Sequence, residues 1–149
     1  MVWSQTSRSA ADGLTYPGLQ GSRKERTEAL LDFFGLAACA DSLPTDISHL
    51  LRKRAEIAQA LAVAPKLLLL DEPFGGLTRE ESFDLIDLLR RCQTEGGLTI
   101  LLIDHNMEVV MEACEGLYVM HHGALIASGS PEEIRSNERV CKVYLAGEL

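Results

Sequence analysis

The sequence predicts an α/β fold in which parallel strands are joined by crossover helices. Two apolar runs, Leu67–Leu70 and Leu98–Ile103, are each followed at once by polar residues. A segment with helical periodicity lies between them, and two strands joined by a helix in one sheet form a right-handed parallel crossover. Because a continuous apolar run is typical of a strand covered on both faces, both runs are expected to be buried.

The part before the first strand is expected to be helical. Residues 1–22 are rich in Ser, Thr, Gly and Gln without periodicity, which predicts a loose leader. Arg23–Phe34 has an apolar face and is followed by Gly35, a typical helix stop. A longer amphipathic helix is expected over Ile47–Ala64, ended by Pro65.

The part after the first strand adds further helices and a hairpin. The capping-box pattern Thr78–Glu81 opens a helix that Gly96-Gly97 end, and another helix begins near Met107. Two short strands are expected at Leu117–His121 and Ala124–Ser128, joined by a tight turn at His122-Gly123. A helix start at Ser130–Glu133 and a closing helix near Asn137–Leu145 follow. The sequence therefore predicts a small β-hairpin near the end of the chain.

Composition excludes several classes of protein. The 149 residues carry a net charge of −8, which disfavours a nucleic-acid binder and predicts no nucleic-acid partner. No apolar run approaches the roughly 18 residues of a membrane-spanning helix. The four cysteines are widely spaced without a CxxC pair, so we expect buried free thiols at Cys92 and Cys114 rather than a zinc site.

Acidic and imidazole side chains follow the two apolar strands. Asp71 and Glu72 come directly after the first strand, and Asp104-His105-Asn106 after the second. Ligands bind beyond the carboxyl ends of parallel strands, so one acid could serve a metal ion and its neighbour a reacting water. The sequence contains no G-x-x-x-x-G-K-[ST] motif, the loop that cradles phosphates.

These motifs together resemble the ATP-binding subunits of ABC transporters. Leu67–Pro73 resembles their Walker B strand with its catalytic glutamate, and Asp104-His105 the position of their switch histidine. Ile47–Leu51, followed by a basic helix, occupies the place of the signature motif Leu-Ser-Gly-Gly-Gln. The tail Pro131–Leu145 is similar to the branched-chain amino-acid uptake ATPases. The resemblance covers residues 23–149 and implies the C-terminal part of a P-loop ATPase domain of ABC type, without the phosphate loop.

The resemblance implies a role for each site residue. Asp71 would hold Mg²⁺ between the phosphates of ATP, and Glu72 would act as general base toward the attacking water. His105 would contact the γ-phosphate and hold that water in line. Ser48 would face the γ-phosphate bound to the opposite subunit, or it would only cap a helix.

The sequence departs from the family at the signature motif and at one loop. Leu50 and Leu51 stand where the family has Gly and Gln, and a leucine side chain obstructs close approach to phosphate. Thr78, in the position of the family's D-loop, is interpreted as a helix cap. His49, His121 and His122 are interpreted as structural or surface residues.

The expected function is that of a partial ATP-binding subunit of an ABC importer for branched-chain amino acids. Its partners would be a second ATP-binding subunit and a membrane permease, and it would lie peripherally on the cytoplasmic face of the membrane. Without the phosphate loop, the isolated chain is expected to be inactive and to leave an apolar face or sheet edge uncovered, as in a truncated or split subunit. The alternatives are a non-catalytic module that docks on a full-length ATPase or permease, and an ABC-type fragment used in DNA repair or translation.

Overall fold

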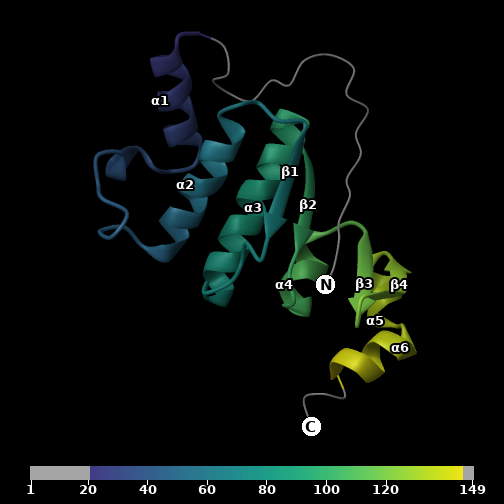
Figure 1. The fold of residues 1–149 in the computed structure, drawn as a ribbon. Coiled ribbons are helices and arrows are strands. Elements are labelled where there is room, and N and C mark those ends of the chain that lie inside the picture. Colours follow the sequence, from purple (N-terminus) through teal and green to yellow (C-terminus); the bar gives the residue numbers. More distant parts are fainter. Residues whose placement is uncertain (1–20, 146–149) are drawn as a thin grey trace. The chain divides into compact units, whose positions relative to one another are not determined.

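The computed structural model describes residues 21–145 (Figure 1), so residues 1–20 of the predicted leader lie outside the described part. Contacts divide the described chain into two units. The helical unit holds residues 21–68 and 74–99, and the hairpin unit holds residues 69–73 and 100–145.

The helical unit begins with two helices that cap each other. These are α1 (Arg23–Phe33) and α2 (His49–Leu61), with a short 3₁₀ turn at Ala37–Cys39 between them. Arg26 of α1 donates from Nη2 to the carbonyl of Ala62 at 3.0 Å, at the C-cap of α2. Arg54 of α2 donates from Nη1 to the carbonyl of Phe34 at 3.4 Å, at the C-cap of α1. Each arginine thus satisfies a terminal carbonyl of the other helix, where cations are favoured.

The third helix of this unit, α3 (Arg79–Gly96), is amphipathic and supplies much of its core. Thr78 caps it through a complete capping box with Glu81, which confirms the interpretation of Thr78 as a cap. Gly97 ends it in the left-handed conformation, at φ +64°. The buried apolar side chains of the helical unit are Leu30, Phe34, Leu36, Ile57, Ala58, Leu61, Leu68, Phe74, Leu85, Ile86, Leu88, Leu89, Cys92 and Leu98. Among the residues that the structure describes, no helix combines the length and apolarity needed to cross a bilayer.

The hairpin unit contains the ends of two parallel strands and all the elements that follow the second of these strands. The strands are β1 (Leu67–Asp71) and β2 (Thr99–Ile103), which are hydrogen-bonded neighbours in one sheet. After them come α4 (Met107–Ala113), β3 (Leu117–His121), β4 (Ala124–Gly129), α5 (Pro131–Arg135), α6 (Glu138–Val140) and a π-helical turn (Cys141–Leu145). The buried apolar side chains of this unit are Ile100, Leu102, Val109, Val110, Cys114, Leu117, Val119, Ile134 and Val140.

Backbone hydrogen bonds fix the direction of β1 and β2. The Thr99 amide donates to the Lys66 carbonyl at 3.0 Å, and the Glu72 amide donates to the Ile103 carbonyl at 2.7 Å. Both partners advance along the chain together, so the strands are parallel, as the sequence predicted. Their carboxyl ends consequently lie side by side, with the two polar clusters at the same edge.

The hairpin of β3 and β4 is antiparallel and closes in a tight turn. Leu117 pairs with Gly129 and His121 with Ala124, with an irregularity between Val119 and Met120. The turn residues His122 and Gly123 have φ of +48° and +78°, and positive φ at both central positions is what a two-residue hairpin turn prefers. The predicted hairpin is therefore confirmed.

The expectation that Leu67–Leu70 is covered on both faces is wrong for the described residues. Leu68 is only 5% exposed, but Leu67 and Leu69 are 50% and 65% exposed. Alternate residues of a strand point to opposite faces, so one face of β1 is packed and the other is open. The expectation of an uncovered apolar face is borne out at these two leucines.

Some predicted boundaries also change. The helix expected over Ile47–Ala64 begins at His49, because the extended backbone of Ser48 makes that residue the N-cap, and it ends at Leu61. Leu98 lies just before β2 rather than inside it. The closing helix expected over Asn137–Leu145 is a short α-helical segment that passes into the π-helical turn.

The burial of the cysteines predicts their reactivity. Burial raises the pKa of the Cys92 thiol to about 12, and Cys114 is 5% exposed, whereas Cys39 and Cys141 are half-buried. Since the thiolate is the reactive species, a disulfide reagent at about pH 8 should label Cys39 and Cys141 in the native chain. Cys92 and Cys114 should react only after denaturation. In the control variants, Cys141→Ser removes one fast equivalent and Cys92→Ala removes none; four fast thiols in the native chain would contradict the structure.

Candidate functional site

Two acids stand where β1 ends. Asp71 is the last residue of the strand and Glu72 the first beyond it, and both side chains are exposed. Glu72 has φ of +46°, in the left-handed region that residues with a side chain seldom adopt. Its amide donates to the Ile103 carbonyl, which holds this turned backbone beside the end of β2. The backbone therefore turns immediately after β1, at the second of the two acids.

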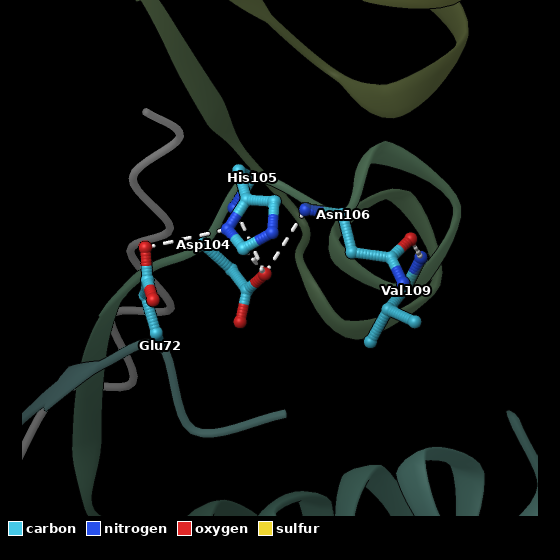
Figure 2. Close-up of polar contacts among 5 residues, drawn as sticks. All are labelled: Glu72, Asp104, His105, Asn106 and Val109. Carbon is cyan, nitrogen blue, oxygen red and sulfur yellow. Dashed lines mark hydrogen bonds and ion pairs between the residues drawn. The ribbon is translucent and has the colours of Figure 1, made fainter. Parts of the chain in front are cut away.

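The end of β2 is organised around a buried carboxylate. Asp104 is 2% exposed, and its Oδ1 accepts from the amide of His105 at 2.8 Å and from the amide of Asn106 at 3.0 Å. Asn106 in turn accepts at Oδ1 from the Val109 amide at 3.3 Å and caps α4. These local hydrogen bonds fold the chain into a turn between β2 and α4 that presents His105 outward (Figure 2).

Glu72 and His105 meet at this edge. Figure 2 shows the two side chains directed toward each other, with 3.3 Å between Glu72 Oε1 and His105 Nδ1. A carboxylate only accepts, so the contact requires a proton on Nδ1, and Nε2 of a neutral ring is then an acceptor. Because 59% of the Glu72 side chain and 74% of the His105 side chain are exposed, water and ligands can reach both groups.

Asp71 is the residue of this edge that suits a magnesium ion. Mg²⁺ is commonly bound through one or two carboxylates, with waters and phosphate oxygens completing its coordination. In the part of the chain that the structure describes, no group of three or more His, Cys, Asp or Glu side chains could hold a metal ion by itself. An exposed carboxylate such as that of Asp71 fits a magnesium ion that water and phosphate oxygens also coordinate.

Ser48, the fourth predicted site residue, belongs to the helical unit. Its hydroxyl accepts from the Leu51 amide at 3.3 Å and caps α2. The structure thus brings Glu72 and His105 together and places Asp71 beside Glu72, while Ser48 acts as a cap in a separately described unit. A hydroxyl also has a donor, so the cap leaves it able to contact an anion.

His49 has a contact that the sequence did not predict. This first residue of α2 lies with its Nε2 3.1 Å from the carbonyl oxygen of Gly75, in the loop that follows β1. A Cβ added to Gly76 would meet the same Nε2 at 3.0 Å, so the ring packs directly against the glycine backbone. The signal in the sequence was a histidine in place of a signature glycine, but its partner is 26 residues away along the chain.

The fold and these strand ends define the class of protein. They form a portion of the ABC-type ATPase fold, with a parallel pair followed by an antiparallel hairpin. The solved structure of MJ1267 in its ADP conformation, an ATP-binding cassette of an ABC transporter, matches with a TM-score of 0.77 and 27% identity, covering 85% of this chain and 51% of that one. CbiO1 from Clostridium perfringens, part of the transporter complex cbiONQ, matches with a TM-score of 0.72 and 30% identity over 84% of this chain and 51% of that one.

The chain belongs to the ATP-binding proteins of ABC transporters. The family described as ABC transporter matches residues 2–75, beginning inside the predicted leader, and the family described as branched-chain amino acid ATP-binding cassette transporter matches residues 124–145. The lipopolysaccharide export system ATP-binding protein LptB of Haemophilus influenzae is 37% identical over 85% of this chain and 52% of its own length. The high-affinity branched-chain amino acid transport ATP-binding protein LivG of Salmonella typhimurium is 35% identical over 85% of this chain and 49% of its own length. The chain thus spans about half the length of these relatives.

The contact of His49 with the glycine loop can be tested with two matched glycines. Gly76 and Gly97 have φ of +77° and +64°, so alanine is strained at either position by about 1–2 kcal/mol. Only at Gly76 does the new Cβ displace His49, since a Cβ at Gly97 meets nothing within 4 Å. Gly76→Ala should therefore lower the free energy of urea unfolding by about 1 kcal/mol more than Gly97→Ala.

A double-mutant cycle separates this contact from general strain. In a His49→Ala background, the extra loss caused by Gly76→Ala should disappear, because the partner has already gone. Equal losses for the two glycine variants, in the presence of His49, would show that the ring does not press on the loop.

Proposed function

We propose that this chain is part of an ATP-binding subunit of an ABC importer for branched-chain amino acids. Family membership supports ATP as the ligand, and the match of residues 124–145 to the branched-chain family supports the substrate class. The observation that carries the proposal is the meeting of Glu72 and His105, 3.3 Å apart, at the ends of neighbouring parallel strands. A carboxylate and an imidazole that are held side by side can both contact one water molecule, the carboxylate as base and the imidazole through its other nitrogen.

In this proposal Glu72 is the general base and His105 holds the reactants. The exposed Glu72 carboxylate accepts a proton from the attacking water. His105 accepts a hydrogen bond from the water through Nε2, because the proton of the neutral ring lies on Nδ1, directed at Glu72. A hydrogen bond to a γ-phosphate oxygen would need a proton on Nε2 as well. Stabilisation of charge on the transferred phosphoryl group is the main catalytic requirement in this chemistry.

Mg²⁺ and ATP are the cofactors of the proposed reaction, and Asp71 would hold the metal. The metal, when bound, neutralises charge that develops on the phosphate oxygens. Ser48 at the start of α2 would contact the phosphate bound to the opposite subunit, although the side chain of Leu50, in the place of a glycine, obstructs the approach of that phosphate to the backbone. The proposed partners are therefore a second ATP-binding subunit and a membrane permease, with the chain on the cytoplasmic face of the membrane.

A non-catalytic role is the second candidate. The chain carries His49, Leu50 and Leu51 in the signature position, where a leucine side chain obstructs close approach to phosphate, and this favours a module that docks on a full-length ATPase or permease. The two candidates differ in whether Glu72 turns over ATP once a phosphate loop is supplied.

An ATPase assay on two proteins distinguishes these roles. The 149-residue chain alone should show no Mg²⁺-dependent ATP hydrolysis, because no loop or lysine secures the phosphates. A chimera that joins the upstream part of LivG, where the family carries its phosphate loop, to this chain should hydrolyse ATP. In the chimera, Glu72→Gln should lower kcat by at least about 100-fold, the usual contribution of a general base.

The controls use an exposed acid of the same unit. Glu115→Gln in the chimera should leave kcat unchanged, whereas His105→Ala should lower it by about 100-fold through loss of the group that orients the attacking water. A folded chimera that binds ATP but is inactive, or one unaffected by Glu72→Gln, would favour the non-catalytic module.

The transported substrate needs a separate experiment, because LptB relatives are slightly more similar than LivG relatives. Two chimeras are made, in which this chain replaces the matching segment of LivG in Salmonella typhimurium and of LptB in Haemophilus influenzae. Restored uptake of radiolabelled leucine with the LivG chimera, without restored lipopolysaccharide export by the LptB chimera, is expected. The opposite result would assign the chain to lipopolysaccharide export.

A further inference from the structure

Asp104 is a buried acid to which the proposed reaction assigns no role. Among the described residues it is one of two buried polar or charged side chains, the other being Ser82. It stands between the last residue of β2 and His105. Burying a carboxylate is costly unless its oxygens are satisfied, so a residue of this type at this position needs a reason.

The two carboxylate oxygens of Asp104 differ in their hydrogen bonds. Oδ1 accepts from the amides of His105 and Asn106, whereas Oδ2 is buried without a hydrogen-bond partner in the described structure. An asparagine could make the same two contacts through its single oxygen. The turn alone therefore does not account for a carboxylate here.

The charge of Asp104 lies close to one particular ring nitrogen. His105 Nδ1 is 3.9 Å from Asp104 Oδ1 and 3.3 Å from Glu72 Oε1 (Figure 2). Two acceptors that carry negative charge thus lie around Nδ1. In a neutral imidazole the position of the single proton is set by the hydrogen bonds that its nitrogens make.

We propose that Asp104 is a positioning residue that, together with Glu72, keeps the ring proton of His105 on Nδ1 and leaves Nε2 for the reactants. Its two amide contacts fix the turn from which the ring projects, and its charge favours Nδ1–H over Nε2–H. The consequence for catalysis rests on the proposed function: a neutral His105 then accepts a hydrogen bond from water through Nε2. The tautomer itself is a property of the chain without nucleotide.

Ring ¹⁵N spectra of the full chain test this assignment, at a pH where the His105 ring is neutral. The native chain should show His105 predominantly as Nδ1–H. Asp104→Asn keeps an oxygen for the two amides but removes the charge, so the ratio of Nδ1–H to Nε2–H should fall by about three- to tenfold. The signals of His121 and His122, exposed residues of the hairpin turn, serve as internal references and should not change.

Amide hydrogen exchange separates the two contributions of Asp104. Asp104→Ala removes the acceptor as well, so the His105 and Asn106 amides should exchange roughly tenfold faster or more, while Asp104→Asn should largely preserve their protection. Ser82→Ala, which removes the other buried polar side chain, should leave both readouts at His105 unchanged even if it lowers stability.

Two results would overturn the proposal. One is a native His105 that is mainly Nε2–H, because Nδ1 would then not be the protonated atom. The other is an Asp104→Asn chain with an unchanged tautomer ratio, since the charge would then have no influence on the ring. Neither result depends on ATP hydrolysis, so an inactive chimera and a wrong tautomer remain distinguishable.

Discussion

The hydrogen bond from the Glu72 amide to the Ile103 carbonyl is the contact on which the candidate site depends. At 2.7 Å it continues the parallel pairing of β1 and β2 one residue past the end of β1. Glu72 is held there with φ of +46°, a conformation that would relax without a partner for its amide. Because the backbone leaves both strands at the same edge of the sheet, Glu72 and His105 lie close together, with 3.3 Å between Oε1 and Nδ1. The ends of the parallel strands thus bring together Glu72 and His105, which are 33 residues apart in the sequence.

Short-range hydrogen bonds then fix the directions of the side chains. Asp104 folds the turn that carries His105, and Asn106 starts the helix immediately behind it. In the helical unit the same principle operates with other residues: Ser48 caps α2, and His49 contacts the Gly75 carbonyl. The substitution of a signature glycine by histidine is therefore accommodated by a new polar contact, which leaves the helix start and its cap intact.

The sequence predicted those features that depend on neighbouring residues. Thr78 with Glu81, Gly97, and the His122-Gly123 turn each determine local backbone geometry, and each appears where it was expected. The presence of the two strands followed from their apolar runs, but the burial of β1 did not, because the exposure of Leu67 and Leu69 depends on what packs over β1 rather than on β1 itself. Ile100 and Leu102 of β2 are buried. The partners of Asp104 and His49 were also not predicted. A buried acid with an unused oxygen, or an imidazole that meets a distant carbonyl, is recognised only once the chain is folded.

The side chains of the candidate site provide only part of what ATP hydrolysis requires. Asp71, Glu72, Asp104 and His105 offer carboxylates and one imidazole, groups suited to a cation, a water and a proton. A triphosphate additionally needs backbone amides and a lysine around its anionic oxygens, and the sequence contains no loop of that kind. In the proposed function, activation of water and retention of nucleotide therefore rest on different segments. Substitutions at Glu72 and His105 should then change turnover without changing nucleotide affinity to the same degree, which is the signature of groups that act mainly in the transition state.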